Sequence, residues 1–488
     1  MKIKEIFLKN LNQKQIIVKN IFWLSLAQLL SKILKAGLII YAARILGVNE
    51  YGRFALALSV VSALAVFGDL GISSLLARQL PKKIKFQSQF LSTSFYLKLL
   101  FIFLFIFLVI FSQIFNPSSK IKTLVFLLLI MGVFDNLLLF FYGISRGQQR
   151  MEKEALIFLL EVFITVSFGF FFLFTFPSAK NLALAYLIGS FSAFLSALYF
   201  FKNYLKKILF YFEKKFVKEI LFSALPFAFA GIVGTFLTYT DVVMIGAILK
   251  NSYLIGIYSA PLKIIRLLFI PAGLIAASIL PVLSKESKKE QSLKLVRRSI
   301  SLLFLLGFPL FFGGIILAKQ IVIFLFGVQY LESAKIFSLL VFLPLLVYPT
   351  TIFGHLLFAY NLQIKNAIFS LIAAILNIFL NLILISKFSI YGAATATLIS
   401  QFFNFVLFFF ATKNLEKSSP ITFSQIKNPL LASIPMAFFL LILKKFSFPL
   451  IPTIVFGATI YLFFLFLLKE PLLKEIKEIL FANKLIFK

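Results

Sequence analysis

The sequence predicts an all-α membrane protein that crosses the bilayer many times. Of its 488 residues, 61% are hydrophobic and 67 are Phe, and the mean hydropathy is +1.02. A soluble domain is closer to half apolar, because polar surface has to cover its core. The apolar residues also fall into separate stretches of roughly 20, which is the length a helix needs to cross the hydrocarbon layer. Basic residues collect between these stretches.

About fourteen stretches have this character, and turn-forming or charged residues separate them. They cover residues 20–43, 53–76, 90–113, 121–143, 155–176, 181–201, 220–248, 254–280, 299–318, 335–360, 366–386, 390–412, 429–446 and 450–468. The eighth stretch is the irregular one, since it contains Pro261 and Pro271 and ends at Pro281. Proline removes a backbone donor, and in a membrane helix it marks a bend where neighbours satisfy the freed carbonyls.

The distribution of Lys and Arg predicts the orientation. If residues 1–19 and every second loop face the cytoplasm, the cytoplasmic segments hold 33 Lys and Arg and the outer segments hold 10. This bias is the one expected from the positive-inside rule. An even number of helices then places both termini in the cytoplasm. The net charge of +32 is spread over short loops, so it indicates a membrane face and no nucleic-acid partner.

The terminal segments are both amphipathic. Residues 1–19 alternate Lys with apolar residues, which indicates either an interfacial helix or a segment that only sets topology. Residues 469–488 place apolar residues at helical spacing and are too charged to span. The predicted organisation is an interfacial segment (1–19), a six-helix half (20–201), a basic cytoplasmic linker (202–219), a second six-helix half (220–412), two additional helices (413–468) and an amphipathic tail (469–488).

Several kinds of chemistry are excluded by residues that the sequence lacks. It has no cysteine, which removes disulfides and thiolate metal sites, and His355 is its only histidine. No GxxxxGK[ST] motif is present for ATP hydrolysis. The longest outer loop, about 319–334, is short for a catalytic site. We therefore expect neither an enzyme nor a bound metal or cofactor.

Two basic pairs lie near the middle of predicted helices. Lys32 and Lys35 are three residues apart in the first helix, and Lys263 and Arg266 are three apart in the eighth. A charge at the bilayer centre costs roughly 2.5–3.5 kcal/mol unless it faces water or a partner. The two pairs therefore predict a cationic cavity for an anionic ligand. The alternative is that some of them reach an interface or pair with buried acids.

The acidic residues at membrane depth have more than one interpretation. Asp135 lies deep in the fourth helix and is the stronger candidate for ion coupling or for pairing with the cavity lysines, and Glu161 lies less deep. Asp69 and Asp241 lie near helix ends, where loop capping or pairing with a basic residue is expected. Lys98 is closer to the cytoplasmic end of its helix, so we expect it to extend towards that interface.

An ordered pattern of turn residues opens the chain and resembles a known family. It consists of Arg44, Leu46-Gly47, Tyr51-Gly52 and Asp69-Leu70-Gly71. The pattern resembles the start of the Wzx-type polysaccharide and O-antigen repeat-unit flippases, a branch of the multidrug/oligosaccharidyl-lipid/polysaccharide exporter superfamily. Further similar positions extend the resemblance over residues 20–410, namely Asp241, Gly327, Tyr330, Ala334, Asn377, Asn381 and Gly392 to Ala394. Asn377 and Asn381, at i and i+4, are expected to hold helices together.

The resemblance implies a fold, a substrate and partners. The fold would be MATE-like, with two six-helix halves around a central cavity and two C-terminal helices. The substrate would be a polyprenyl-diphosphate-linked oligosaccharide, carried across the inner membrane by alternating access. Membrane lipids and other polysaccharide assembly proteins would be its partners. Two alternatives stay open, namely a multidrug or organic-cation antiporter of the same fold and, less favoured, a polysaccharide polymerase or ligase.

Overall fold

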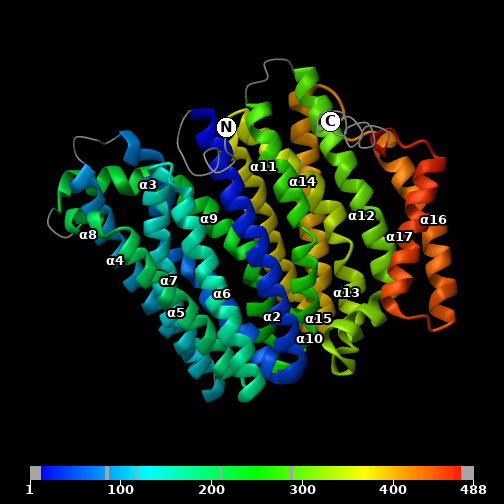
Figure 1. The fold of residues 1–488 in the computed structure, drawn as a ribbon, viewed down its shortest axis with the longest axis horizontal. Helices are drawn as coiled ribbons and strands as arrows, with labels where there is room; N and C mark the ends of the chain where they lie inside the picture. The colour runs from blue at the N-terminus through cyan, green and yellow to red at the C-terminus, as the bar shows by residue number, and fades with distance from the viewer. Residues whose placement is uncertain (1–12, 83–86, 116–117, 209–211, 285–288, 474–488) are drawn as a thin grey trace, which may run out of the picture. The chain divides into compact units, whose positions relative to one another are not determined.

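The computed structural model describes residues 13–82, 87–115, 118–208, 212–284 and 289–473. Within these ranges the regular structure consists of α-helices and short 3-10 turns, and it includes no strand (Figure 1). The all-α prediction is therefore confirmed. By their contacts the helices form two compact units, Met1–Ser259 and Ala260–Lys488. Most of the predicted 1–19 segment and of the 469–488 tail lies outside the described residues.

The first unit is built around the long N-terminal helix. Its helices are α2 (Gln13–Leu64), α3 (Ile72–Gln79), α4 (Gln87–Ser112), α5 (Ser119–Gly147), α6 (Met151–Thr175), α7 (Ala179–Phe200), α8 (Lys202–Ile208), α9 (Lys214–Leu249) and the start of α10 (Ser252–Leu267). Helix α2 packs against α5, α6 and α9, and α7 packs against α5 and α6. Buried aromatic residues such as Phe90, Phe140 and Phe201 fill the core near α4 and α5. The long apolar stretches thus bury one face against each other.

The second unit is centred on α12. Its helices are the rest of α10, α11 (Ile270–Leu283), α12 (Lys289–Phe326), α13 (Ser333–Leu340), α14 (Leu343–Ala359), α15 (Gln363–Glu416), α16 (Phe423–Lys445) and α17 (Leu450–Leu467). Helix α12 packs against α13, α14, α16 and α17, while α14 packs against α11 and α15. Tyr348 and Phe353 are fully buried in the core between α11, α12 and α14.

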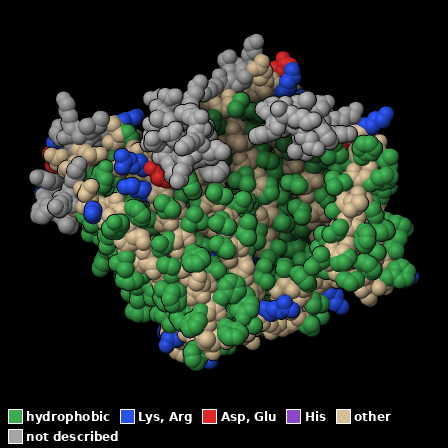
Figure 2. Space-filling model, in the orientation of Figure 1, with side chains coloured by type: hydrophobic (Ala, Val, Ile, Leu, Met, Phe, Trp, Pro, Cys, Tyr) green, Lys and Arg blue, Asp and Glu red, His purple; other side chains and the backbone are tan. Residues whose placement is uncertain are grey.

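Twelve described segments are long and apolar enough to cross a membrane. Two of them are far longer than one crossing needs, since Trp23–Gly68 has 46 residues and the α15 segment has 54. Each contains a break, at Gly47 and at Ser389 respectively. If each part crosses once, the total is fourteen, and that number stays a prediction. Hydrophobic side chains cover most of the face shown in Figure 2, as expected for lipid-facing helices.

The break in α2 depends on two glycines of the opening pattern. Gly47 has φ 73°, a left-handed conformation that a side chain disfavours. Gly52 follows, and a Cβ atom there would collide with the carbonyl oxygen of Ser252 at the start of α10. The opening pattern therefore encodes a bend and a close backbone contact with α10.

The eighth predicted helix is interrupted beside Pro271. Helix α10 ends at Leu267 and α11 begins at Ile270, with Pro271 in its first turn. The Tyr348 hydroxyl of α14 donates a hydrogen bond to the Leu268 carbonyl oxygen at 2.7 Å. A neighbouring helix thus satisfies a backbone acceptor at the interruption, as prolines in membrane helices require.

The predicted linker 202–219 contains the short helix α8 and the first residues of α9. Helix α9 packs against α2, α3 and α4 of the first unit. The division into two six-helix halves with this linker between them stays a prediction.

Candidate functional site

A partly buried ion pair between α2 and α6 is the central feature of the candidate site. The Nζ atom of Lys35 lies 3.0 Å from Oε1 of Glu161. The Lys35 side chain is 29% exposed and that of Glu161 is 11% exposed. The aromatic rings of Phe158 and Tyr186 lie 5.8 Å and 5.9 Å from the same Nζ atom. The Lys35 ammonium group therefore contacts one carboxylate and lies near two aromatic rings. The carboxylate and the rings all stabilise a positive charge.

A second carboxylate, Asp135 of α5, belongs to the same group of side chains. It is close enough to Glu161 and Lys35 for its charge to interact with both of theirs. Its Oδ1 atom is buried and has no hydrogen-bond partner within the described part of the chain. The site thus places one cation beside two carboxylates where α2, α5, α6 and α7 pack together. The sequence favoured Asp135 as the partner of the cavity lysines, and the direct contact is made by Glu161.

Lys32 has different surroundings although it precedes Lys35 by about one helical turn. Its side chain is exposed, and among the described residues it forms no ion pair. The spacing i, i+3 puts both lysines on one side of α2. Only Lys35, however, is covered by α6 and α7.

Lys263 and Arg266 lie on the part of α10 that belongs to the second unit. Both side chains are half-buried, and neither is without interactions. Arg266 stands in the last turn before the interruption, where its carbonyl oxygen accepts the Phe269 N–H at 3.2 Å. That Lys263 and Arg266 form one cationic site with Lys32 and Lys35 stays a proposal.

The expectation that Lys98 reaches the interface is wrong. Its side chain is fully buried, and its Nζ atom lies 2.5 Å from Oδ1 of Asp69 and 3.3 Å from Oδ1 of Asn136. The Ser73 hydroxyl donates a further hydrogen bond to Asp69. Lys98 and Asp69 are 29 residues apart. Sequence spacing gives no signal for such a pair, because the contact depends on how two separate helices are rotated.

Several residues of the family-like pattern have structural surroundings. Asp241 in α9 is buried and accepts a hydrogen bond from the Tyr258 hydroxyl of α10 at 2.8 Å. Tyr51 is fully buried beside the bend in α2, and Gly71 immediately precedes α3. Arg44 is exposed just before the bend. Tyr51 and Gly71 thus lie at a bend and at a helix start, and Asp241 links α9 to α10.

Asn377 and Asn381 connect the two parts of α15. The Asn381 amide donates to Oδ1 of Asn377 at 3.0 Å. The Asn377 amide in turn lies 3.4 Å from the hydroxyls of Thr397 and Ser400, beyond the break at Ser389. Both asparagines are buried, and these bonds engage their NH₂ groups and the Asn377 carbonyl oxygen inside the helix packing.

A hollow in the second unit, with several polar side chains in its lining, was not predicted from the sequence. It has a volume of about 250 Å³ between α14 and α15, and its lining includes His355, Asn366 and Gln401. The Nδ1–H group of His355 donates a hydrogen bond to the Thr351 carbonyl oxygen at 3.0 Å. No charged side chain lines this hollow among the described residues. The Lys35 group is therefore the better candidate for binding an ion or an anionic ligand.

Residues 17–287 match the family described as polysaccharide biosynthesis protein. The match covers more than half of the chain. The chain belongs to this family. The resemblance of the opening pattern to the polysaccharide exporters is thereby confirmed.

Two relatives of the chain have names that refer to glycan or polysaccharide biosynthesis. The chain is 26% identical over 391 residues to a probable low-salt glycan biosynthesis flippase, Agl15, of Haloferax volcanii, covering 78% of this chain and 81% of the relative. It is 24% identical over 411 residues to the capsular polysaccharide biosynthesis protein CapF of Staphylococcus aureus, covering 82% of this chain and all of that one.

Solved structures with the same fold include two kinds of transporter. A structure of the lipid II flippase MurJ in an inward closed conformation has a TM-score of 0.76 at 20% identity, covering 93% of this chain and all of that one. An inward-facing multidrug transporter of the MATE family has a TM-score of 0.63 at 15% identity, covering 80% and 94%. This family member therefore has the expected MATE-like, multi-pass membrane fold.

Proposed function

We propose that the protein is a flippase that moves a polyprenyl-diphosphate-linked oligosaccharide across the cytoplasmic membrane for O-antigen, capsule or exopolysaccharide synthesis. The family and both named relatives support a role in glycan assembly. The fold is shared with a lipid flippase. The observation that carries the proposal is Lys35, a cation held at membrane depth with its own counter-anion, Glu161. A diphosphate headgroup is the kind of anion that can replace that carboxylate.

In the proposed transport cycle, Lys35 pairs alternately with Glu161 and with the phosphate of the substrate. In the structure Glu161 neutralises Lys35, which avoids the large penalty for an unpaired charge in a membrane. A phosphate oxygen that binds Lys35 displaces Glu161 and leaves the lysine paired in both states. The displaced Glu161 then lies beside Asp135, and two neighbouring carboxylates repel each other unless one binds a proton or a cation. Headgroup binding is thereby coupled to uptake of a cation.

The remaining basic residues complete the proposed headgroup contacts. Lys32 is exposed and unpaired among the described residues, so it is available to a polar ligand. The sequence predicts that the second basic pair also contacts the headgroup: Lys263 would supply a second point charge, and the planar guanidinium of Arg266 would bind a phosphate group through two parallel hydrogen bonds. Alternating access opens this site to one side of the membrane at a time, while the lipid tail stays in the bilayer.

The experiment is flux of a labelled polyprenyl-diphosphate oligosaccharide in vesicles containing the full chain. Lys35→Ala and Lys263→Ala should each lower flux about ten-fold or more, since a hydrogen bond to a charged group contributes about 1.5–3 kcal/mol. Lys120→Ala removes an exposed lysine at the start of α5 and serves as the control. Normal flux in both cavity variants would overturn the headgroup site. Transport of a labelled organic cation in the same vesicles would then favour the antiporter alternative, whose fold this chain shares.

The proposal also includes the protein's location in the cell and its partners. The protein resides in the cytoplasmic membrane with both termini in the cytoplasm, as the bias of Lys and Arg indicates. It transports its substrate without altering it and needs no cofactor. Its partners are membrane lipids and other polysaccharide assembly proteins, which deliver the lipid-linked glycan on one side and consume it on the other.

A further inference from the structure

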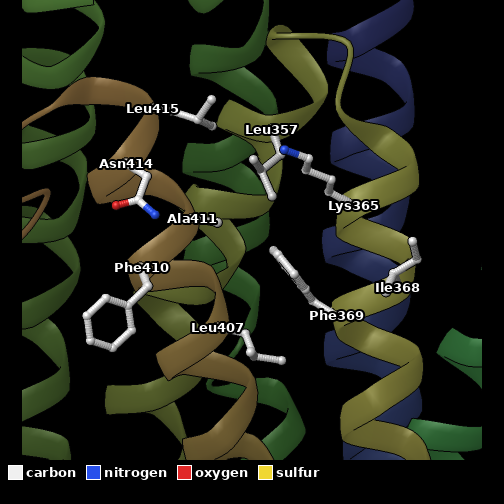
Figure 3. A pocket seen from close by; sticks show the side chains of 9 residues that line it. All are labelled: Leu357, Lys365, Ile368, Phe369, Leu407, Phe410, Ala411, Asn414 and Leu415. Atoms are coloured by element: carbon white, nitrogen blue, oxygen red, sulfur yellow. The ribbon is translucent and has the colours of Figure 1, made fainter.

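A groove in the second unit has an apolar lining and a basic end. It has a volume of about 470 Å³, within the range of small-molecule sites. Figure 3 shows the side chains that line it, and their apolar members are Leu357, Ile368, Phe369, Leu407, Phe410, Ala411 and Leu415. The two polar lining residues are Lys365 and Asn414. The groove is therefore amphiphilic along its length.

The fold of α15 creates this arrangement. The break at Ser389, with φ 55°, lets the two parts of α15 lie side by side, and Asn377 hydrogen-bonds across them. Lys365 comes from the beginning of α15 and Asn414 from its end, yet both line one groove. On the second part, Leu407, Ala411 and Asn414 follow the spacing of one helix face.

Among the described residues, no acid forms an ion pair with the basic end of the groove. Lys365 is exposed and has no ion-pair or hydrogen-bond partner among the described residues. In Figure 3 its ammonium nitrogen points across the upper end of the groove towards Leu357. Lys413 in the last turn of α15 and Lys417 just after it are also exposed, close in sequence to the lining residue Asn414. Glu416 is buried, and its Oε1 atom accepts a hydrogen bond from the Tyr360 hydroxyl at 2.7 Å, while its Oε2 atom has no hydrogen-bond partner among the described residues.

We propose that this groove binds one anionic phospholipid, with an acyl chain against the apolar lining and the phosphate at Lys365. Apolar lining with a basic end matches an amphiphile better than it matches a water-soluble ligand. Basic pockets between membrane helices on the cytoplasmic side are suited to anionic lipid headgroups. The lysines near the two ends of α15, Lys365, Lys413 and Lys417, favour a lipid with net negative charge over a zwitterionic one. The proposal concerns the second unit alone and does not depend on the transported substrate.

The test measures lipid binding to the purified full chain by native mass spectrometry, with phosphatidylglycerol and phosphatidylcholine of matched acyl chains. We expect phosphatidylglycerol to bind several-fold more tightly. Lys365→Ala should weaken phosphatidylglycerol about five-fold, because one basic residue near an anionic headgroup contributes about 1 kcal/mol. Ala411→Phe, which fills the groove, should weaken both lipids. Lys387→Ala removes an exposed lysine of α15 outside the groove and should leave binding unchanged.

Two outcomes would overturn the proposal. In the first outcome, the two lipids bind equally well and Lys365→Ala changes neither affinity. This result would mean that lipids bind the groove without specificity for the headgroup. In the second outcome, polyprenyl phosphate displaces an equal concentration of phosphatidylglycerol, and Ala411→Phe abolishes polyprenyl phosphate binding. This result would assign the groove to the tail of a transported lipid instead. Unaltered elution of each variant in size-exclusion chromatography shows that it is folded.

Discussion

Replacing Glu161 by Gln separates the effect of the Lys35–Glu161 pair on stability from its effect on headgroup binding. The substitution keeps the size of the side chain and removes its charge. At 3.0 Å, two unit charges attract by about 5.5 kcal/mol with an effective dielectric constant of about 20. The net coupling is smaller, because both ions lose hydration on burial and Lys35 keeps part of its exposure. We therefore expect a coupling of about 2 kcal/mol.

This coupling has consequences of opposite sign for stability and for binding. Glu161→Gln should lower the free energy of unfolding by about 2 kcal/mol, because Lys35 loses its counter-anion. It should tighten binding of a prenyl diphosphate by up to about thirty-fold, since the headgroup no longer competes with a carboxylate at Lys35 and 1.4 kcal/mol corresponds to a factor of ten. Lys35→Met should abolish this gain when combined with Glu161→Gln.

The assay is equilibrium binding of a fluorescent prenyl diphosphate to detergent-purified protein, with denaturant unfolding of the same four proteins as a double-mutant cycle. The wild type, both single variants and the double variant give the coupling energy directly. An unchanged dissociation constant in Glu161→Gln, or a coupling energy below about 0.5 kcal/mol, would refute the view that Glu161 competes with the headgroup.

Two other predictions follow from the structure and the charge pattern. Lys98→Met should destabilise the protein by about 3 kcal/mol, because it leaves the largely buried Asp69 without its cation. The double variant Lys98→Met, Asp69→Asn should recover part of this loss in the same unfolding assay, and equal stability of the two variants would contradict the pairing. Reporter fusions at Lys215, Lys289 and Lys417 should report the cytoplasm, and fusions at Lys250 and Lys387 the outside; one reversed pair would mean a missed or false helix.

The apolar stretches predicted the helices well because crossing a membrane is a local requirement. Transfer of about 20 residues into hydrocarbon depends mainly on the composition of that stretch. Helices α4, α5 and α6 accordingly coincide with predicted stretches within a few residues. The irregularity beside Pro271 was also visible, because proline acts on the backbone of its own helix.

The sequence by itself determined the membrane class, the approximate helix positions and, through the opening pattern from Arg44 to Gly71, the family. Tertiary structure alone decided which charges are paired. Glu161 lies 126 residues from Lys35, and Lys98 meets Asp69 rather than an interface. Likewise, Lys365 and Asn414 share a groove only because α15 breaks at Ser389. Hydropathy is a sum over neighbouring residues, whereas an ion pair depends on the distance between two helices, which the packing of many other side chains sets.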